Sequence, residues 1–202
     1  EEQGAKIINE LIHKKVDIVV DPVFLLTKNE WELILGDKLI MSDSYIFAYF
    51  LGDNEIHRRE VIDFAKRKKI KIVTMPHLDQ YIKKDEHFGD VQLYDVDPFD
   101  FLRLIRNANY ICTDSFHGTA FSILFNKQFI VFDRYKKNST TSKNSRIESI
   151  CNMLDLTWRR FNGNNMNILD EKIDYQDVNE KLDKLTSKSK KYLLDSLNRS
   201  RI

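Results

Sequence analysis

The sequence has few of the residues and patterns that mark several large classes of protein. Its 202 residues include two cysteines, three prolines and six glycines. Two cysteines without metal-ligand spacing provide neither a zinc site nor a disulfide framework, which favours a reducing environment. No apolar run approaches the ~20 residues of a membrane-spanning helix, and the first residues have no secretory-signal pattern. We therefore expect a cytoplasmic location, with peripheral attachment to the inner face of the membrane as the alternative.

An excess of charge and the common catalytic motifs are also missing. Lys and Arg number 32 and Asp and Glu 31, so the net charge of +1 gives no reason to expect nucleic acid as a partner. The sequence lacks a Walker loop, GxGxxG after a strand, HExxH, CxxC and GxSxG. Kinases, simple dehydrogenases, zinc hydrolases and α/β-hydrolases thus lose their usual support. A transferase without metal or cofactor, or a binding domain, is what we expect.

The sequence does contain β-branched and aromatic runs that alternate with helical patterns. Residues 45–51 form a continuous apolar run without alternation, which is typical of a parallel strand buried on both faces. Similar runs predict strands at 71–76, near 110 and at 129–132, with helices between them. The fold class is therefore α/β, with a Rossmann-like parallel sheet flanked by helices.

The two ends of the chain have a different pattern. Residues 5–13 predict a helix, and residues 16–20 predict a strand that ends at Pro22. We interpret residues 1–43 as the end of an upstream domain plus a linker, residues 44–175 as the Rossmann-like domain, and residues 176–202 as a C-terminal helix. Residues 77–97 are interpreted as a loop with one short helix.

The stretch at residues 110–127 is the main candidate for a functional site. It combines a strand, a polar turn and a helix, and in an open α/β sheet such a turn lies at the edge where ligands bind. His117 is two residues into the helix, where it could donate to a phosphate or act as a general acid or base. Asp114 or Ser115 could cap the helix. Local features leave a site histidine and an ordinary helix-start histidine equally supported.

Two further groups of residues could bind an anion. Gly52 and Asn54 lie at another turn from strand to helix, although the arginines behind them also fit a solvated helix face. Arg134 and Arg146 follow the last predicted strand and could neutralise a phosphorylated donor. Arg146 begins a helix, where a cation opposes the helix dipole unless an anion is bound.

The segment from Ala108 to Phe129, with DSFHGT at residues 114–119, resembles the hallmark segment of the polysaccharide pyruvyl transferase family. Asp21-Pro22, the helix at 99–105 and residues 144–147 resemble that family in the same order. The resemblance covers roughly residues 1–155, and DSFHGT is its one strongly specific motif.

The resemblance implies a two-domain fold similar to GT-B glycosyltransferases, of which this chain would be the C-terminal, donor-binding half. The rest of the protein would supply the N-terminal domain. The implied activity is transfer of pyruvate from phosphoenolpyruvate to two hydroxyls of a sugar, which makes a cyclic ketal on a cell-surface polysaccharide or its lipid-linked precursor. This places the protein in exopolysaccharide biosynthesis, with phosphoenolpyruvate as donor substrate and a glycan as acceptor.

The resemblance also assigns residues. His117 would be catalytic. Some members of the family carry an arginine where this chain has Ser115, and Arg134 or Arg146 is the candidate to replace it. The implied donor-binding residues are Ser115, Phe116, Gly118, Thr119, Arg134 and Arg146, and the possible second anion site is Gly52 and Asn54.

Two other functions remain open at this point. A GT-B-type glycosyltransferase that uses a nucleotide sugar shares the expected architecture, and fold alone does not fix function. A non-catalytic sugar- or phosphate-binding domain is the second alternative.

Overall fold

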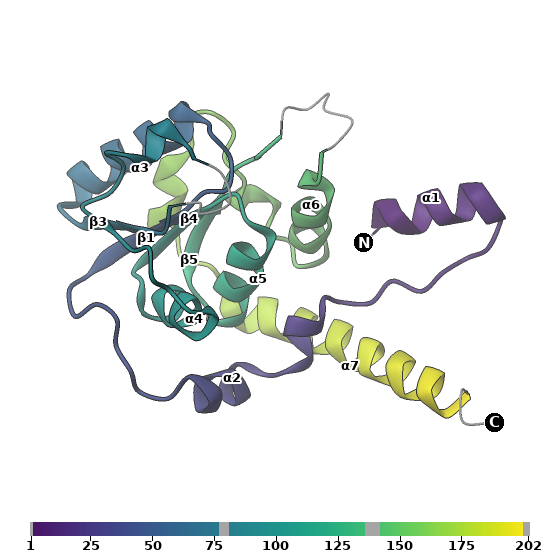
Figure 1. The fold of residues 1–202 in the computed structure, drawn as a ribbon. Coiled ribbons are helices and arrows are strands. Elements are labelled where there is room, and N and C mark those ends of the chain that lie inside the picture. Colours follow the sequence, from purple (N-terminus) through teal and green to yellow (C-terminus); the bar gives the residue numbers. More distant parts are fainter. Residues whose placement is uncertain (1, 77–80, 136–141, 200–202) are drawn as a thin grey trace.

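Five short parallel strands form the sheet at the centre of the protein (Figure 1). The computed structural model describes residues 2–76, 81–135 and 142–199. The strand order is β3-β2-β1-β4-β5, and every neighbouring pair is parallel. The strands are β1 (Tyr45–Tyr49), β2 (Lys71–Thr74), β3 (Val91–Gln92), β4 (Tyr110–Thr113) and β5 (Gln128–Val131). The predicted α/β class with a Rossmann-like parallel sheet is confirmed.

Helices follow the strands in the alternating order that the sequence predicts. They are α1 (Glu2–Ile12), α2 (Lys28–Leu35), α3 (Glu55–Lys68), α4 (Pro98–Asn107), α5 (Phe116–Leu124), α6 (Asn144–Met153) and α7 (Tyr175–Arg199). Short 3-10 turns are η1 (Pro22–Leu25), η2 (Lys83–Asp85), η3 (Thr157–Arg159) and η4 (Met166–Asp170). Thr27 and Glu30 form a capping box at α2, and Asp97 caps α4 ahead of Pro98. These caps satisfy backbone N–H groups that a first turn leaves without partners.

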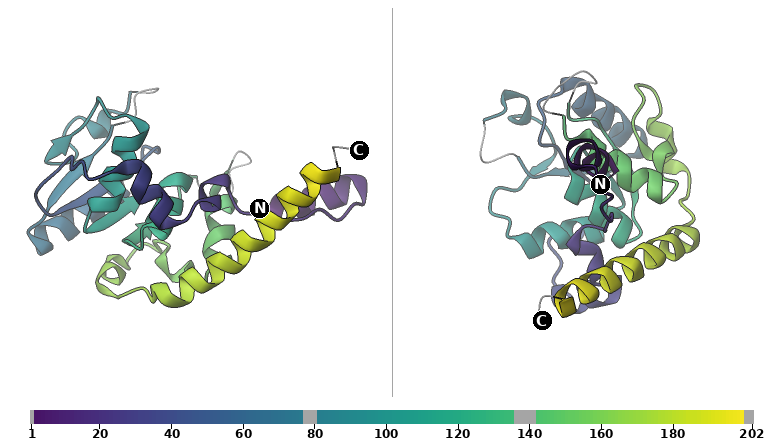
Figure 2. Two further views of the ribbon diagram at one scale, coloured as in Figure 1. Left: turned by 90° about the horizontal axis from the view of Figure 1, so that it is seen from below. Right: turned by 90° about the vertical axis from the view of Figure 1, so that its right-hand side faces the viewer.

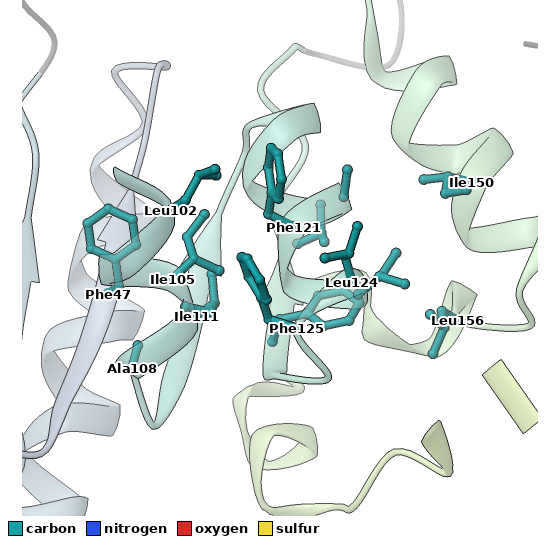
Figure 3. Packing of buried hydrophobic residues seen from close by; sticks show 14 of the residues in the cluster. Phe47, Leu102, Ile105, Ala108, Ile111, Phe121, Leu124, Phe125, Ile150 and Leu156 are labelled. Carbon is teal, nitrogen blue, oxygen red and sulfur yellow. The ribbon is translucent and has the colours of Figure 1, made fainter. Parts of the chain in front are cut away.

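The sheet is buried on both faces because successive strand residues point to opposite sides. Phe47 and Ile111 pack with α4 and α5, whereas Ile46 and Cys112 pack with α3 and η4. Figure 3 shows Phe121 and other α5 side chains between the residues of α4 and those of α6. The apolar runs of the strands lack alternation for this reason: both faces need apolar side chains.

Two sequence predictions on the strands are wrong. Residues 16–20 form no strand. A strand needs a neighbour for its backbone hydrogen bonds, but the N–H of Val20 donates to Ser189 Oγ of α7 instead. Conversely, residues 77–97, interpreted as a loop with a short helix, contain β3 as well as η2. β3 has two residues, which is too short for any periodic pattern in the sequence.

Both ends of the chain project from the same side of the sheet domain (Figures 1 and 2). α7 packs against η1, and Thr186 Oγ1 donates to the carbonyl of Phe24. Phe24 and Leu35 are also buried in the main core, so residues before 43 pack directly on the sheet domain. The division into domains stays a prediction. Within the described residues, no helix is both long and apolar enough to cross a membrane.

Candidate active site

The carboxyl ends of β1 and β4 form the point where the strand order of the sheet reverses. β1 has β2 on one side and β4 on the other, and the chain continues from β4 to β5 at the opposite edge. The connections that leave these two strands therefore run in opposite directions, which opens a crevice between them. In α/β sheets this is the position where ligands bind.

A buried carboxylate joins the two loops at this point. Asp114, which follows β4, accepts hydrogen bonds from the N–H groups of Leu51 (2.7 Å) and Gly52 (2.9 Å) in the loop after β1. Arg134 Nη2 donates to the backbone carbonyl of Asp114 (3.2 Å). Burial raises the pKa of Asp114, and the two N–H groups and the Arg134 charge oppose that rise. Asp114 has a structural role, but it holds the loop after β1 and does not cap α5.

Ser115 is the residue that caps α5. Its Oγ accepts a hydrogen bond from the N–H of Gly118 (3.2 Å), and its carbonyl accepts from the N–H of Thr119 (2.9 Å). Within the described part of the chain, the N–H groups of Phe116 and His117 have no partner, as expected in a first helical turn. These two donors can bind an anion.

α5 approaches β4 closely, and only a small residue fits at the contact. A Cβ atom on Gly118 would lie 2.6 Å from Thr113 Oγ1. That distance is far inside van der Waals contact, so the glycine lets the helix start directly beside the strand.

The imidazole of His117 lies beside a carboxylate from a remote part of the chain. Its Nε2 is 4.0 Å from Asp21 Oδ2, and Arg146 Nη2 is 3.5 Å from the same oxygen. The other oxygen of Asp21 accepts from the N–H of Val23 (3.1 Å), which fixes the carboxylate at the start of η1. The Arg146 guanidinium lies over the Phe116 ring, 4.1 Å from its centroid. A fixed carboxylate is thus placed between an imidazole and a guanidinium.

Two cavities open at the start of α5. The first, which we call the charged cavity, has a volume of about 250 Å³. It is lined by Val19, Val20, Asp21, Phe24, Phe116, Arg146, Ser149, Ile150 and Met153. The second, which we call the aromatic cavity, has a volume of about 440 Å³. It is lined by Trp31, Tyr49, Leu51, Pro98, Phe99, Phe101, Leu102, Ser115, His117 and Phe121.

The structure places the other predicted site residues away from the imidazole of His117. Gly52 already donates its N–H to Asp114, and Asn54 caps α3 through the N–H of Ile56. Thr119 is fully buried, and its hydroxyl donates to the carbonyl of Ser115 (2.9 Å). Arg134 contacts Asp114, as described above. Among the predicted residues, Ser115, Phe116, His117 and Arg146 therefore line the two cavities.

Sequence reasoning did not identify the partner of His117 or the walls of the aromatic cavity. Asp21 was noted only with Pro22, at the end of a predicted strand and in the family resemblance, Phe99 only as part of a helix, and Trp31 not at all. Asp21 is 96 positions before His117, so no local spacing connects them. Within the described residues, no group of three or more His, Cys, Asp or Glu side chains is arranged to hold a metal ion.

The fold and this site define a Rossmann-like α/β domain with two cavities beside the reversal of its strand order. The site offers a histidine, an arginine and free backbone donors, which together suit an anionic substrate. The family model for polysaccharide pyruvyl transferase matches residues 1–135, and the chain belongs to this family. The match includes Asp21 and the DSFHGT segment and ends before Arg146. No curated protein matched the chain at a significant level.

Proposed function

We propose that this protein takes part in the transfer of pyruvate from phosphoenolpyruvate to two hydroxyls of a sugar in a cell-surface polysaccharide or its precursor. The observation that carries the proposal is the position of His117. It lies in the family's DSFHGT segment at the start of α5, and its imidazole is 4.0 Å from a carboxylate that also contacts Arg146. Membership of the family supports a transferase of the pyruvyl transferase kind.

The reaction needs an acid, a base and cationic groups. Protonation of the methylene carbon of phosphoenolpyruvate makes a methyl group and leaves the neighbouring carbon electron-poor. One sugar hydroxyl adds to that carbon and loses its proton. The bond to the phosphate oxygen then breaks, and inorganic phosphate leaves. A second hydroxyl of the same sugar adds, which closes the ketal ring without any oxidation or reduction. Of the two hydroxyl protons, one restores the acid and the other leaves with the phosphate.

The residues at the site match these needs. His117 donates the proton as the acid, and the carboxylate of Asp21 lies 4.0 Å from its Nε2. Once it has given up its proton, the imidazole serves as the base that accepts the proton of a hydroxyl. Arg146 and the free N–H groups at the start of α5 bind the phosphate and carboxylate of the donor. Asp21 is itself an anion, so its role is to position His117 and Arg146 and not to bind the donor.

The test is formation of the ketal by the full-length protein with phosphoenolpyruvate and an acceptor glycan. His117→Ala is expected to lower the rate roughly 10²- to 10⁴-fold, the range for loss of a general acid or base. The side chain of His117 is 53% exposed, so the unfolding midpoint should not change. His87→Ala, at another exposed histidine, is the matched control. Ketal formation that survives His117→Ala would contradict the proposal.

A binding measurement separates this function from nucleotide-sugar chemistry. Phosphoenolpyruvate is expected to raise the melting temperature by mass action, because it binds the folded state alone. A nucleotide diphosphate sugar is expected to leave it unchanged. The opposite pattern would favour a glycosyltransferase.

A further inference from the structure

The aromatic cavity beside His117 has the size and position of a second substrate site. Its volume of about 440 Å³ falls within the ~300–1,000 Å³ typical of small-molecule pockets. Side chains from α2, β1, α4 and α5 meet there, which means that the folded sheet domain builds it. Its polar side chains at the α5 wall are Ser115 and His117.

The aromatic walls are held in place by contacts behind them. Trp31 meets Phe121 edge to face, with 5.2 Å between ring centroids, and its Nε1 donates to the carbonyl of Val23 (3.0 Å). Tyr49 and Phe101 meet in the same way at 5.0 Å. Rings that are fixed before a ligand arrives lose little freedom when it binds.

Phe99 differs from these rings because the core does not need it. It is 47% exposed at the start of α4, and it belongs to neither hydrophobic core cluster. A large apolar ring that remains half exposed at the mouth of a cavity is available for contact with a ligand.

The chemistry of the walls disfavours the donor and favours a neutral ring. Among the described residues, no Lys, Arg, Asp or Glu lines this cavity. A phosphate or carboxylate would find Ser115 and His117 as its polar side-chain partners there, too few to replace the water that it loses, which is costly. A pyranose ring carries no charge. Its C–H bonds point their positive ends at the electron-rich faces of aromatic rings, and its hydroxyls can turn to the polar edge.

We propose that the aromatic cavity binds the pyranose ring of the acceptor sugar, with the reacting hydroxyls at the His117 edge. This assignment rests on the proposed function, since it places the second substrate of the same reaction. The donor then lies on the side of Asp21 and Arg146, and the acceptor lies on the side of Phe99. His117 stands between them and can exchange protons with both.

Fluorescence of the native tryptophan can test the proposal directly. The sequence has two tryptophans, Trp31 in the cavity and Trp158 in η3. Trp158→Phe therefore leaves Trp31 as the one source of tryptophan emission. Methyl α- and β-pyranosides of glucose, galactose and mannose serve as probes in titrations of the full chain. At least one of them is expected to change the Trp31 emission saturably.

A variant at Phe99 shows whether the effect arises in this cavity. Phe99→Ala in the Trp158→Phe background is expected to weaken pyranoside binding about 3- to 10-fold, as for loss of one aromatic contact. Tyr192→Ala removes another half-exposed ring, on α7, and is the matched control that should leave binding unchanged. Circular dichroism melts check that both variants fold.

Competing ligands provide the outcomes that would overturn the proposal. Saturating phosphoenolpyruvate should not displace the pyranoside. The proposal fails if no pyranoside changes the Trp31 emission, or if phosphoenolpyruvate or farnesyl phosphate occupies the cavity in its place. Pyranoside binding that depends on Phe99 in a protein that forms no ketal would refute the proposed function and leave this site standing. Ketal formation by Phe99→Ala with an unchanged KM for the acceptor would refute this site and leave the proposed function standing.

Discussion

The two cavities at the start of α5 have different kinds of side chains in their walls, although two residues that are adjacent in the sequence line them. Phe116 lines the charged cavity and His117 the aromatic one. In the charged cavity, Asp21 lies 3.5 Å from Arg146 and 4.0 Å from His117. In the aromatic cavity, ring pairs meet edge to face.

Under the proposed function, this difference lets the start of one helix contact two substrates of different chemistry. The distances around Asp21 are longer than a good charged hydrogen bond of ~2.7–2.9 Å, so the donors of Arg146 can turn toward an incoming anion. The aromatic rings, in contrast, are already held in position by ring–ring contacts before a ligand binds. The charged cavity suits an anionic ligand, and the aromatic cavity suits an uncharged ligand whose shape matches its walls.

Removal of the arginine affects the charged cavity alone and has the largest expected effect among the changes that distinguish the two cavities. Arg146→Ala should raise the KM for phosphoenolpyruvate about 100-fold, because a hydrogen bond to a charged group contributes about 1.5–3 kcal/mol. The KM for the acceptor should not change. Steady-state kinetics of ketal formation measure both.

Two variants control this measurement. Arg146→Lys should recover part of the loss, since it keeps the charge but not the planar fork. Arg59→Ala, at an exposed arginine of α3, should have no effect. If Arg146→Ala leaves the KM for the donor unchanged, Arg134 becomes the better candidate for donor binding.

A substitution at Gly118 should disturb both cavities together, because both depend on the position of α5. The added Cβ would lie 2.6 Å from Thr113 Oγ1 and 3.2 Å from its Cγ2. Gly118→Ala should therefore lower the free energy of unfolding by about 1–3 kcal/mol, as overpacking does. Urea denaturation measures this. Gly52→Ala should cost less, since one of its two closest contacts is the flexible chain of Arg134. Equal stability of Gly118→Ala and the native protein would show that α5 can shift.

The pH dependence of stability tests a buried histidine of the scaffold, His57, separately from the candidate site. Burial, reinforced by the nearby Arg58, lowers the pKa of His57 to about 4. The folded state then binds fewer protons than the unfolded state, where a histidine titrates near its ordinary value of 6.5. The stability from neutral His57 is complete above that value and is lost as the pH falls toward 4. The expected loss between pH 7 and pH 5 is about 2 kcal/mol.

His57→Gln is the variant for this test, because it keeps a polar group near Asn54 without the titration. Urea denaturation at both pH values should show a smaller pH dependence than in the native protein. An identical pH dependence of stability in both proteins would mean that a titratable group other than His57 controls it. Activity that is lost at pH 5 in the native protein but kept in His57→Gln would then report unfolding.

Loss of the negative charge beside His117 should have the smallest effect. Asp21→Asn keeps the size of the side chain but removes the negative charge that lies 3.5 Å from Arg146 and 4.0 Å from His117. The rate of ketal formation should fall by a few-fold, because Arg146 and His117 are then positioned less firmly. Asp21→Glu should restore the rate in part in the same steady-state assay. An unchanged rate in Asp21→Asn would assign Asp21 a purely structural role at η1.

Much of the fold follows from short-range patterns. The parallel strands near residues 45, 71, 110 and 129 were predicted because continuous apolar runs mark strands that are covered on both faces. The caps at Thr27 and Asp97 are short-range patterns of the same kind, because the capping residues lie within three positions of the N–H groups that they bind. The strand predicted at 16–20 failed because β-branched residues do not supply a pairing partner. β3 was not predicted because its two residues are too few to show the periodic pattern of a strand.

The start of α5 was recognisable because a strand, a turn and a helix follow one another within eighteen residues. His117 was a candidate on that basis, Gly118 and Thr119 were candidates through the family resemblance, and the two arginines were candidates because they follow the last strand. Their surroundings were not predictable. Asp21 and Trp31 reach the site from segments that lie far away in the chain, and sequence spacing carries no information about such contacts.

The α/β class, the family and the histidine at the start of α5 follow from local pattern and from a contiguous motif. The approach of Asp21 to Arg146 on one side of this helix start, and the shared cavity of Trp31, Phe99 and Phe101 on the other, depend on the folded core. Packing of the core, not spacing along the chain, brings those segments together.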